Sequence, residues 1–155
     1  MTLAEHIQAV QARIAAAAEK AGRDPSEVTL VAATKVQTSE TIRAAIAAGI
    51  TVCGENRAQE FTQHWQDGAY KGAKVHFIGH LQKNKLKYLV GKVDMIESVD
   101  SEELIRLIDK RAQNLGIVQD ILIEVNIGGE ASKSGVKPDR KSTRLNSSYG
   151  KLSRM

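Results

Sequence analysis

The sequence predicts an α/β protein built on a parallel sheet. Short apolar runs begin near residues 28, 51, 74, 94 and 119, about one every 20–25 residues. Segments whose apolar residues recur at helical spacing lie between these runs. This alternation is typical of repeated βα units, whose right-handed crossovers bring the carboxyl ends of all strands to one edge of the sheet. Ligands bind at that edge in α/β folds.

An amphipathic helix is predicted over residues 1–21, before the first strand. Leu3, Ile7 and Val10 recur at spacings of three and four residues and would share one face. Thr2 and Glu5 form a capping-box pattern at its start, and Gly22 suits its end. The acidic residues in this segment exclude a secretory signal peptide.

The remaining elements continue the alternation. Strands are predicted over residues 28–34, 50–54, 74–78, 94–99 and 120–127. Helices are predicted over residues 38–48 and 81–90, and a further helix begins after Asn56. The last predicted helix begins at a cap formed by Asp100 and Glu103 and ends at Gly116. In the helix after Asn56, the expected buried side is formed by Phe61 and Trp65. In the helix that ends at Gly116, it is formed by Leu104, Leu107, Ile108 and Leu115.

Two architectures fit five such units. They could form a complete open parallel sheet of the flavodoxin type, or the first five of the eight units of a (β/α) barrel. The pattern alone favours the open sheet, because a barrel would be incomplete.

Charge and composition exclude several classes of protein. The chain has 22 basic and 18 acidic residues, but four basic and no acidic residues lie in 141–155, so residues 1–140 are formally neutral. A neutral body argues against nucleic-acid binding. No apolar run is long enough to cross a membrane. The single cysteine, Cys53, allows no internal disulfide and is typical of a reducing, cytoplasmic setting.

The last fifteen residues differ in composition from the rest of the chain. Residues 141–155 contain four serines and no acid, and they have no clear hydrophobic period. We interpret residues 1–140 as one domain and 141–155 as an unrelated, disordered tail that comes from read-through or cloning.

Lys35 is the candidate chemical centre because it follows an apolar run, Val28–Thr34, at a predicted strand end. An amine beside an apolar wall is disfavoured as the ammonium, and the neutral amine can attack an aldehyde to form a Schiff base. On spacing alone, a solvated lysine that merely ends the strand is the better interpretation. Asn56, by the same standard, could bind a ligand oxygen or simply cap a helix.

Four motifs resemble the pyridoxal-phosphate homeostasis proteins. They are Val31-Ala-Ala-Thr-Lys35, Gly54-Glu-Asn-Arg-Ala-Gln-Glu60, His76-Phe-Ile-Gly-His-Leu-Gln-Lys-Asn-Lys85, and Glu124-Val-Asn-Ile-Gly-Gly-Glu-Ala-Ser-Lys-Ser-Gly135. Each motif is weak alone, but together they occur in the right order at matching strand ends. The resemblance covers about residues 1–140.

The resemblance implies a cofactor site in a barrel like the N-terminal domain of alanine racemase. It implies that Lys35 carries pyridoxal 5′-phosphate (PLP) as a Schiff base, that Asn56 lies beside the cofactor, and that Ile78 and Gly79 line its ring. No metal and no catalytic residue are implied. The family is cytoplasmic and is thought to buffer PLP or to deliver it to PLP-dependent apoenzymes.

One part of the family pattern has no counterpart in this sequence. The cup for the cofactor phosphate and the arginine facing the pyridine nitrogen come from the last barrel units, and no motif here matches them. The resemblance therefore reverses the architectural preference, to about five of the eight units of a barrel. The expected function is a PLP carrier without catalysis. The alternatives are a PLP-dependent racemase or decarboxylase, and a fragment with no function.

Overall fold

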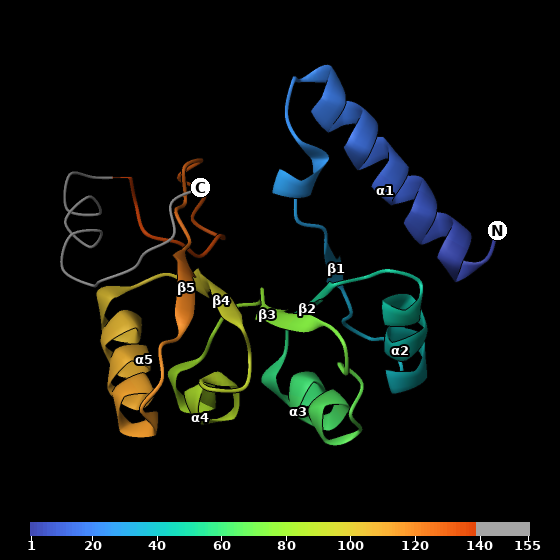
Figure 1. Cartoon of the computed structure of the whole chain (residues 1–155). Coiled ribbons are helices and arrows are strands. Elements are labelled where there is room, and N and C mark those ends of the chain that lie inside the picture. The colour runs from blue at the N-terminus through green and yellow to red at the C-terminus, as the bar shows by residue number, and fades with distance from the viewer. Residues whose placement is uncertain (139–155) are drawn as a thin grey trace. The chain divides into compact units, whose positions relative to one another are not determined.

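A computed structural model of the chain describes residues 1–138, and the predicted tail at 141–155 lies outside them. The contacts divide these residues into two units. The first holds residues 1–55 and 59–75, and the second holds residues 56–58 and those from His76 onward. Helices and strands alternate in both units (Figure 1).

The first unit contains three α-helices, one 3₁₀ helix and two full strands. Its elements are α1 (Leu3–Lys20), the short 3₁₀ helix η1 (Pro25–Glu27), β1 (Val31–Ala33), α2 (Ser39–Ala47), β2 (Val52–Glu55) and α3, which spans Ala58–Gln66. The capping box of α1 is formed as predicted, with the Thr2 side chain accepting from the Glu5 backbone N–H. β1 and β2 are parallel, with Val31 opposite Val52 and Ala33 opposite Gly54.

The second unit continues the alternation. It contains most of β3 (Lys74–Phe77), then η2 (Lys83–Lys85), α4 (Leu86–Leu89), β4 (Met95–Val99), α5 (Glu102–Leu115) and β5 (Asp120–Ile123). β3 pairs with β4 and β4 with β5, both in parallel. Helices α4 and α5 lie side by side on one face of β4 and β5 (Figure 1).

The strand order decides between the two predicted architectures. The five strands follow one another in the sheet in chain order, β1-β2-β3-β4-β5. A flavodoxin-like open sheet would place β1 between β2 and β3, whereas consecutive order is that of a (β/α) barrel. The fold is therefore a partial barrel of five βα units, as the resemblance implied, and the flavodoxin-type arrangement is wrong.

Four details of the predicted elements are wrong. The fifth strand ends at Ile123 and not at residue 127. The first strand is shorter than residues 28–34, and the predicted helix over 81–90 is a 3₁₀ turn followed by four α-helical residues. Ser101 caps α5 in place of Asp100, because its hydroxyl accepts from the Leu104 N–H.

The buried sides of two helices also differ from the prediction. Trp65 is 43% exposed and Leu115 is 49% exposed. On α3 the buried positions are Phe61 and His64. Trp65 lies at the margin of this buried side, where its ring contacts the ring of Phe61. On α5, Ile105 and Ala112 are buried and complete the apolar face formed by Leu104 and Ile108.

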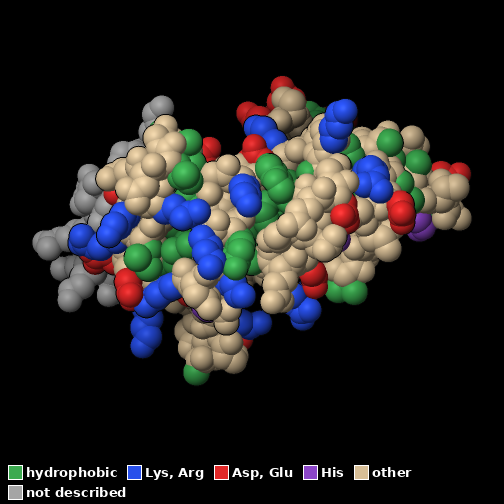
Figure 2. Space-filling view, turned by 90° about the horizontal axis from the view of Figure 1, so that it is seen from below, with side chains coloured by type: hydrophobic (Ala, Val, Ile, Leu, Met, Phe, Trp, Pro, Cys, Tyr) green, Lys and Arg blue, Asp and Glu red, His purple; other side chains and the backbone are tan. Residues whose placement is uncertain are grey.

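No helix within residues 1–138 is long and apolar enough to cross a membrane. Basic and acidic side chains occur together on the face drawn in Figure 2. This agrees with the balanced charge of residues 1–140.

Candidate functional site

Lys35 lies in a tight turn directly after β1. The Gln37 N–H donates to the Thr34 carbonyl at 3.2 Å, so Lys35 and Val36 occupy the centre of the turn. The Lys35 side chain is exposed. The predicted apolar wall beside it is wrong, because Ala33 is exposed and Val31 and Ala32 are only half-buried. Within the described residues β1 pairs only with β2 and is an edge strand. Its side chains are therefore less buried than those of an interior strand.

A buried carboxylate lies beneath this turn. Glu55, the last residue of β2, is 0% exposed. Its Oε1 accepts from Thr34 Oγ1 at 2.6 Å and from the Tyr70 hydroxyl at 2.7 Å, and it lies 3.1 Å from His64 Nδ1. Its second oxygen, Oε2, has no hydrogen-bond partner among residues 1–138. A carboxyl group buried away from water is retained only where hydrogen bonds compensate it, and the hydroxyls of Thr34 and Tyr70 supply two of them here.

This carboxylate affects its titratable neighbours. Burial raises the pKa of the Tyr70 hydroxyl far above its ordinary value, and the hydrogen bond to Glu55 raises it further. Burial, with a smaller contribution from the charge of Glu55, raises the pKa of the Cys53 thiol to about 11. A thiol with so high a pKa stays protonated at neutral pH and is a poor nucleophile. Both groups therefore have structural roles in the first unit.

The second unit brings two of the predicted site residues together. Asn56 follows β2 and Gly79 follows β3, and a Cβ atom on Gly79 would lie 2.1 Å from the Asn56 carbonyl oxygen. Only glycine allows the two backbones to approach so closely. The Asn56 side-chain oxygen Oδ1 is buried and has no hydrogen-bond partner among residues 1–138. An unsatisfied buried acceptor is uncommon and is consistent with a ligand donor at this point. Ile78, the third predicted site residue of the second unit, is half-buried.

Two histidines near these strand ends already have partners. His76 is buried and its Nδ1 lies 2.6 Å from Glu97 Oε1, so it is a core histidine with a partner. His80 is exposed and lies near Asp100. Among the described residues no cluster of side chains could hold a metal ion.

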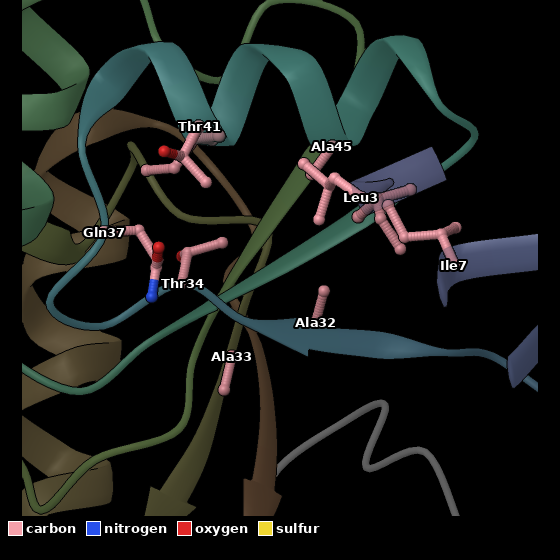
Figure 3. Close-up of a pocket in the computed structure, with 10 residues that line it drawn as sticks. Leu3, Ile7, Ala32, Ala33, Thr34, Gln37, Thr41 and Ala45 are labelled. Carbon is pink, nitrogen blue, oxygen red and sulfur yellow. The ribbon is translucent and has the colours of Figure 1, made fainter. Parts of the chain in front are cut away.

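A cavity of about 270 Å³ lies between α1, β1 and α2. Figure 3 shows Leu3 and Ile7 at one end of it and Thr34 and Gln37 at the other. Its walls are mainly apolar side chains and it contains no charged group. The cavity is therefore a gap in helix–strand packing and supplies no chemistry to the site.

Sequence reasoning missed the group formed by Glu55, His64 and Tyr70. One signal was available, because a glutamate that closes the otherwise apolar run Val52–Glu55 must find partners if the strand is buried. The partners are nine and fifteen residues away and could not be assigned without the fold.

The family model that matches this chain is that of the alanine racemase N-terminal domain, over residues 6–148. Two curated relatives are pyridoxal phosphate homeostasis proteins. The protein of Aquifex aeolicus is 45% identical to this chain, and the match covers 90% of this chain and 61% of the relative. The protein of Pseudomonas aeruginosa is 39% identical, and the match covers 89% of this chain and 60% of the relative. The chain thus spans about three fifths of the length of these relatives.

Solved structures agree with these matches. The crystal structure of an unknown protein from Bifidobacterium adolescentis superimposes with a TM-score of 0.81 at 41% identity, over 88% of this chain and 59% of that one. PipY of Synechococcus elongatus, solved with PLP bound, superimposes with a TM-score of 0.75 at 28% identity, over 94% and 63%. The chain belongs to the alanine racemase N-terminal domain family, and the curated relatives that it resembles are named pyridoxal phosphate homeostasis proteins.

Proposed function

We propose that this protein binds PLP covalently through Lys35 and acts as a carrier or buffer of the cofactor, not as a catalyst. The observation that carries the proposal is the position of Lys35, an exposed amine on a tight turn after the first strand of a barrel whose relative PipY was solved with PLP bound. When PLP is bound, its aldehyde can form a Schiff base with a lysine amine.

Three residues of the second unit, taken by themselves, have chemistry that suits PLP. The unsatisfied Asn56 Oδ1 can accept a hydrogen bond from a donor on the ring. Gly79 packs directly on the Asn56 backbone and so keeps these two residues together, and Ile78 can supply apolar contact to the ring. We assign Asn56, Ile78 and Gly79 to cofactor binding on these grounds.

The biological role follows from the relatives. Proteins named for PLP homeostasis support a non-catalytic role, and PLP-dependent apoenzymes are the partners that we propose for delivery. The unpaired thiol of Cys53 supports a reducing, cytoplasmic setting.

Trapping the Schiff base tests the proposal. The full 155-residue chain is mixed with one equivalent of PLP and reduced with borohydride, and the mass of the intact protein is measured. We expect the unmodified sequence and Lys71→Ala to gain one pyridoxyl phosphate group, and Lys35→Ala to gain none. Lys71 is a matched control, since it is also exposed in the first unit. Equal labelling of Lys35→Ala would contradict the assignment of Lys35.

A further inference from the structure

The turn that carries Lys35 is strained. Val36 has a φ of +62°, the left-handed region that β-branched residues rarely adopt, and its side chain is 81% exposed. Turns with a positive φ at this position normally contain glycine or asparagine. Strained residues of this kind persist only where the surrounding structure holds them, and they cluster at ligand-binding sites. The contacts that hold this turn are therefore of functional interest.

Helix α3 holds the turn mainly through His64. The ring atom Nε2 of His64 lies 3.0 Å from the Gln37 carbonyl oxygen, at the end of the turn. Its Nδ1 lies 3.1 Å from Glu55 Oε1, and that oxygen accepts from Thr34 Oγ1 at the start of the turn. One buried imidazole is thus linked to both ends of the turn, directly to Gln37 and through Glu55 to Thr34.

A second residue of α3 supports the centre of the same turn. Glu60 Oε2 accepts from the Val36 backbone N–H at 3.4 Å, a long contact. Glu60 and His64 are one helical turn apart, so they share the side of α3 that faces the turn. The shorter contacts of His64 make it the principal support.

The chemistry of the ring makes this support directional. The Gln37 carbonyl oxygen can only accept a hydrogen bond, so Nε2 of His64 is the donor in that contact. Nδ1, on the other side of the ring, lies 3.1 Å from Glu55 Oε1 and 3.2 Å from the Tyr70 hydroxyl, so the ring is held between these two buried groups and the turn.

We propose that His64 is a positioning residue that fixes the backbone around Lys35 in the orientation needed to capture PLP. The inference rests on the proposed function of Lys35. Without the link to Gln37, PLP would have to order the turn as it binds, and we expect its dissociation constant to rise about tenfold.

Two conservative variants separate this role from a purely structural one. The amide nitrogen of His64→Gln can replace Nε2 and reach Gln37, whereas that of His64→Asn can replace only Nδ1 and reach Glu55. We expect His64→Gln to bind PLP within about threefold of the unmodified protein and His64→Asn to bind about tenfold more weakly. Gln66→Ala, an exposed position on the same helix, is the matched control and should change nothing.

Amide hydrogen exchange supplies a readout that does not need PLP. The Gln37 amide, which donates to Thr34 O, should exchange faster in His64→Asn than in His64→Gln. Equal affinities and equal exchange in the two variants would overturn the proposal, and so would tighter binding by His64→Asn. If His64→Asn does not fold, His64→Gln alone decides. Weakened PLP binding by folded His64→Gln would overturn the proposal, and PLP binding and Gln37 exchange like those of the unmodified protein would support it. Failure of the unmodified protein to bind PLP would refute the function of Lys35, while exchange would still report on the turn.

Discussion

Replacing Glu55 with alanine is expected to lower the free energy of unfolding by about 3–5 kcal/mol. The side chain is completely buried, and one of its oxygens meets Thr34, His64 and Tyr70. Truncation leaves these groups buried without their acceptor and removes the charge that faces the His64 ring. Urea unfolding, followed by circular dichroism and analysed by linear extrapolation, measures the change.

Glu55→Gln is the matched control for this experiment. It keeps the size of the side chain and one acceptor oxygen but removes the charge. We expect a smaller loss, about 1–3 kcal/mol. If Glu55→Ala were as stable as the unmodified protein, the carboxylate would not be the centre of a stabilising group of hydrogen bonds.

The second large effect is expected from Gly79→Ala. A methyl group at this position would lie 2.1 Å from the Asn56 carbonyl oxygen and 2.7 Å from its carbonyl carbon. Both atoms belong to the backbone, so the contact is relieved only if the segment after β2 or the segment after β3 moves. Overpacking of this kind costs about 1–3 kcal/mol and sometimes more. We expect a loss of unfolding free energy in that range, measured by the same urea titration.

Gly128→Ala is the control for the second experiment. Gly128 also has no positive φ, and an added Cβ would meet only the Glu130 side chain, at 3.7 Å. Its stability should stay within about 1 kcal/mol of the unmodified protein. Equal effects of the two substitutions would contradict the close packing of Gly79 on Asn56.

The sequence predicted the order and type of the elements well because hydrophobic periodicity and caps are local signals. Thr2, Thr38 and Gly116 stand at the predicted helix ends. Periodicity identifies an apolar stripe but not its limits, which is why Trp65 and Leu115 were assigned to the core. Both lie at the margin of a stripe whose centre is Phe61 or Ile108.

The sequence also placed the candidate site residues correctly along the chain. Lys35, Asn56 and Gly79 each follow the end of a strand by one or two residues, as predicted. It could not predict that Gly79 contacts the Asn56 backbone, nor that His64 and Glu55 lie beneath the Lys35 turn. These relations depend on side chains that are distant in the chain and are brought together only by the packing of helices on strands. The binding roles of Lys35, Asn56, Ile78 and Gly79 stay predictions.

Locating the trapped cofactor on the chain tests the central claim most directly. The protein is treated with one equivalent of PLP, reduced with borohydride and digested with a protease, and the modified peptide is identified by mass spectrometry. We predict that the pyridoxyl phosphate group lies on Lys35. A label on another lysine, or one spread over the exposed lysines, would contradict the account.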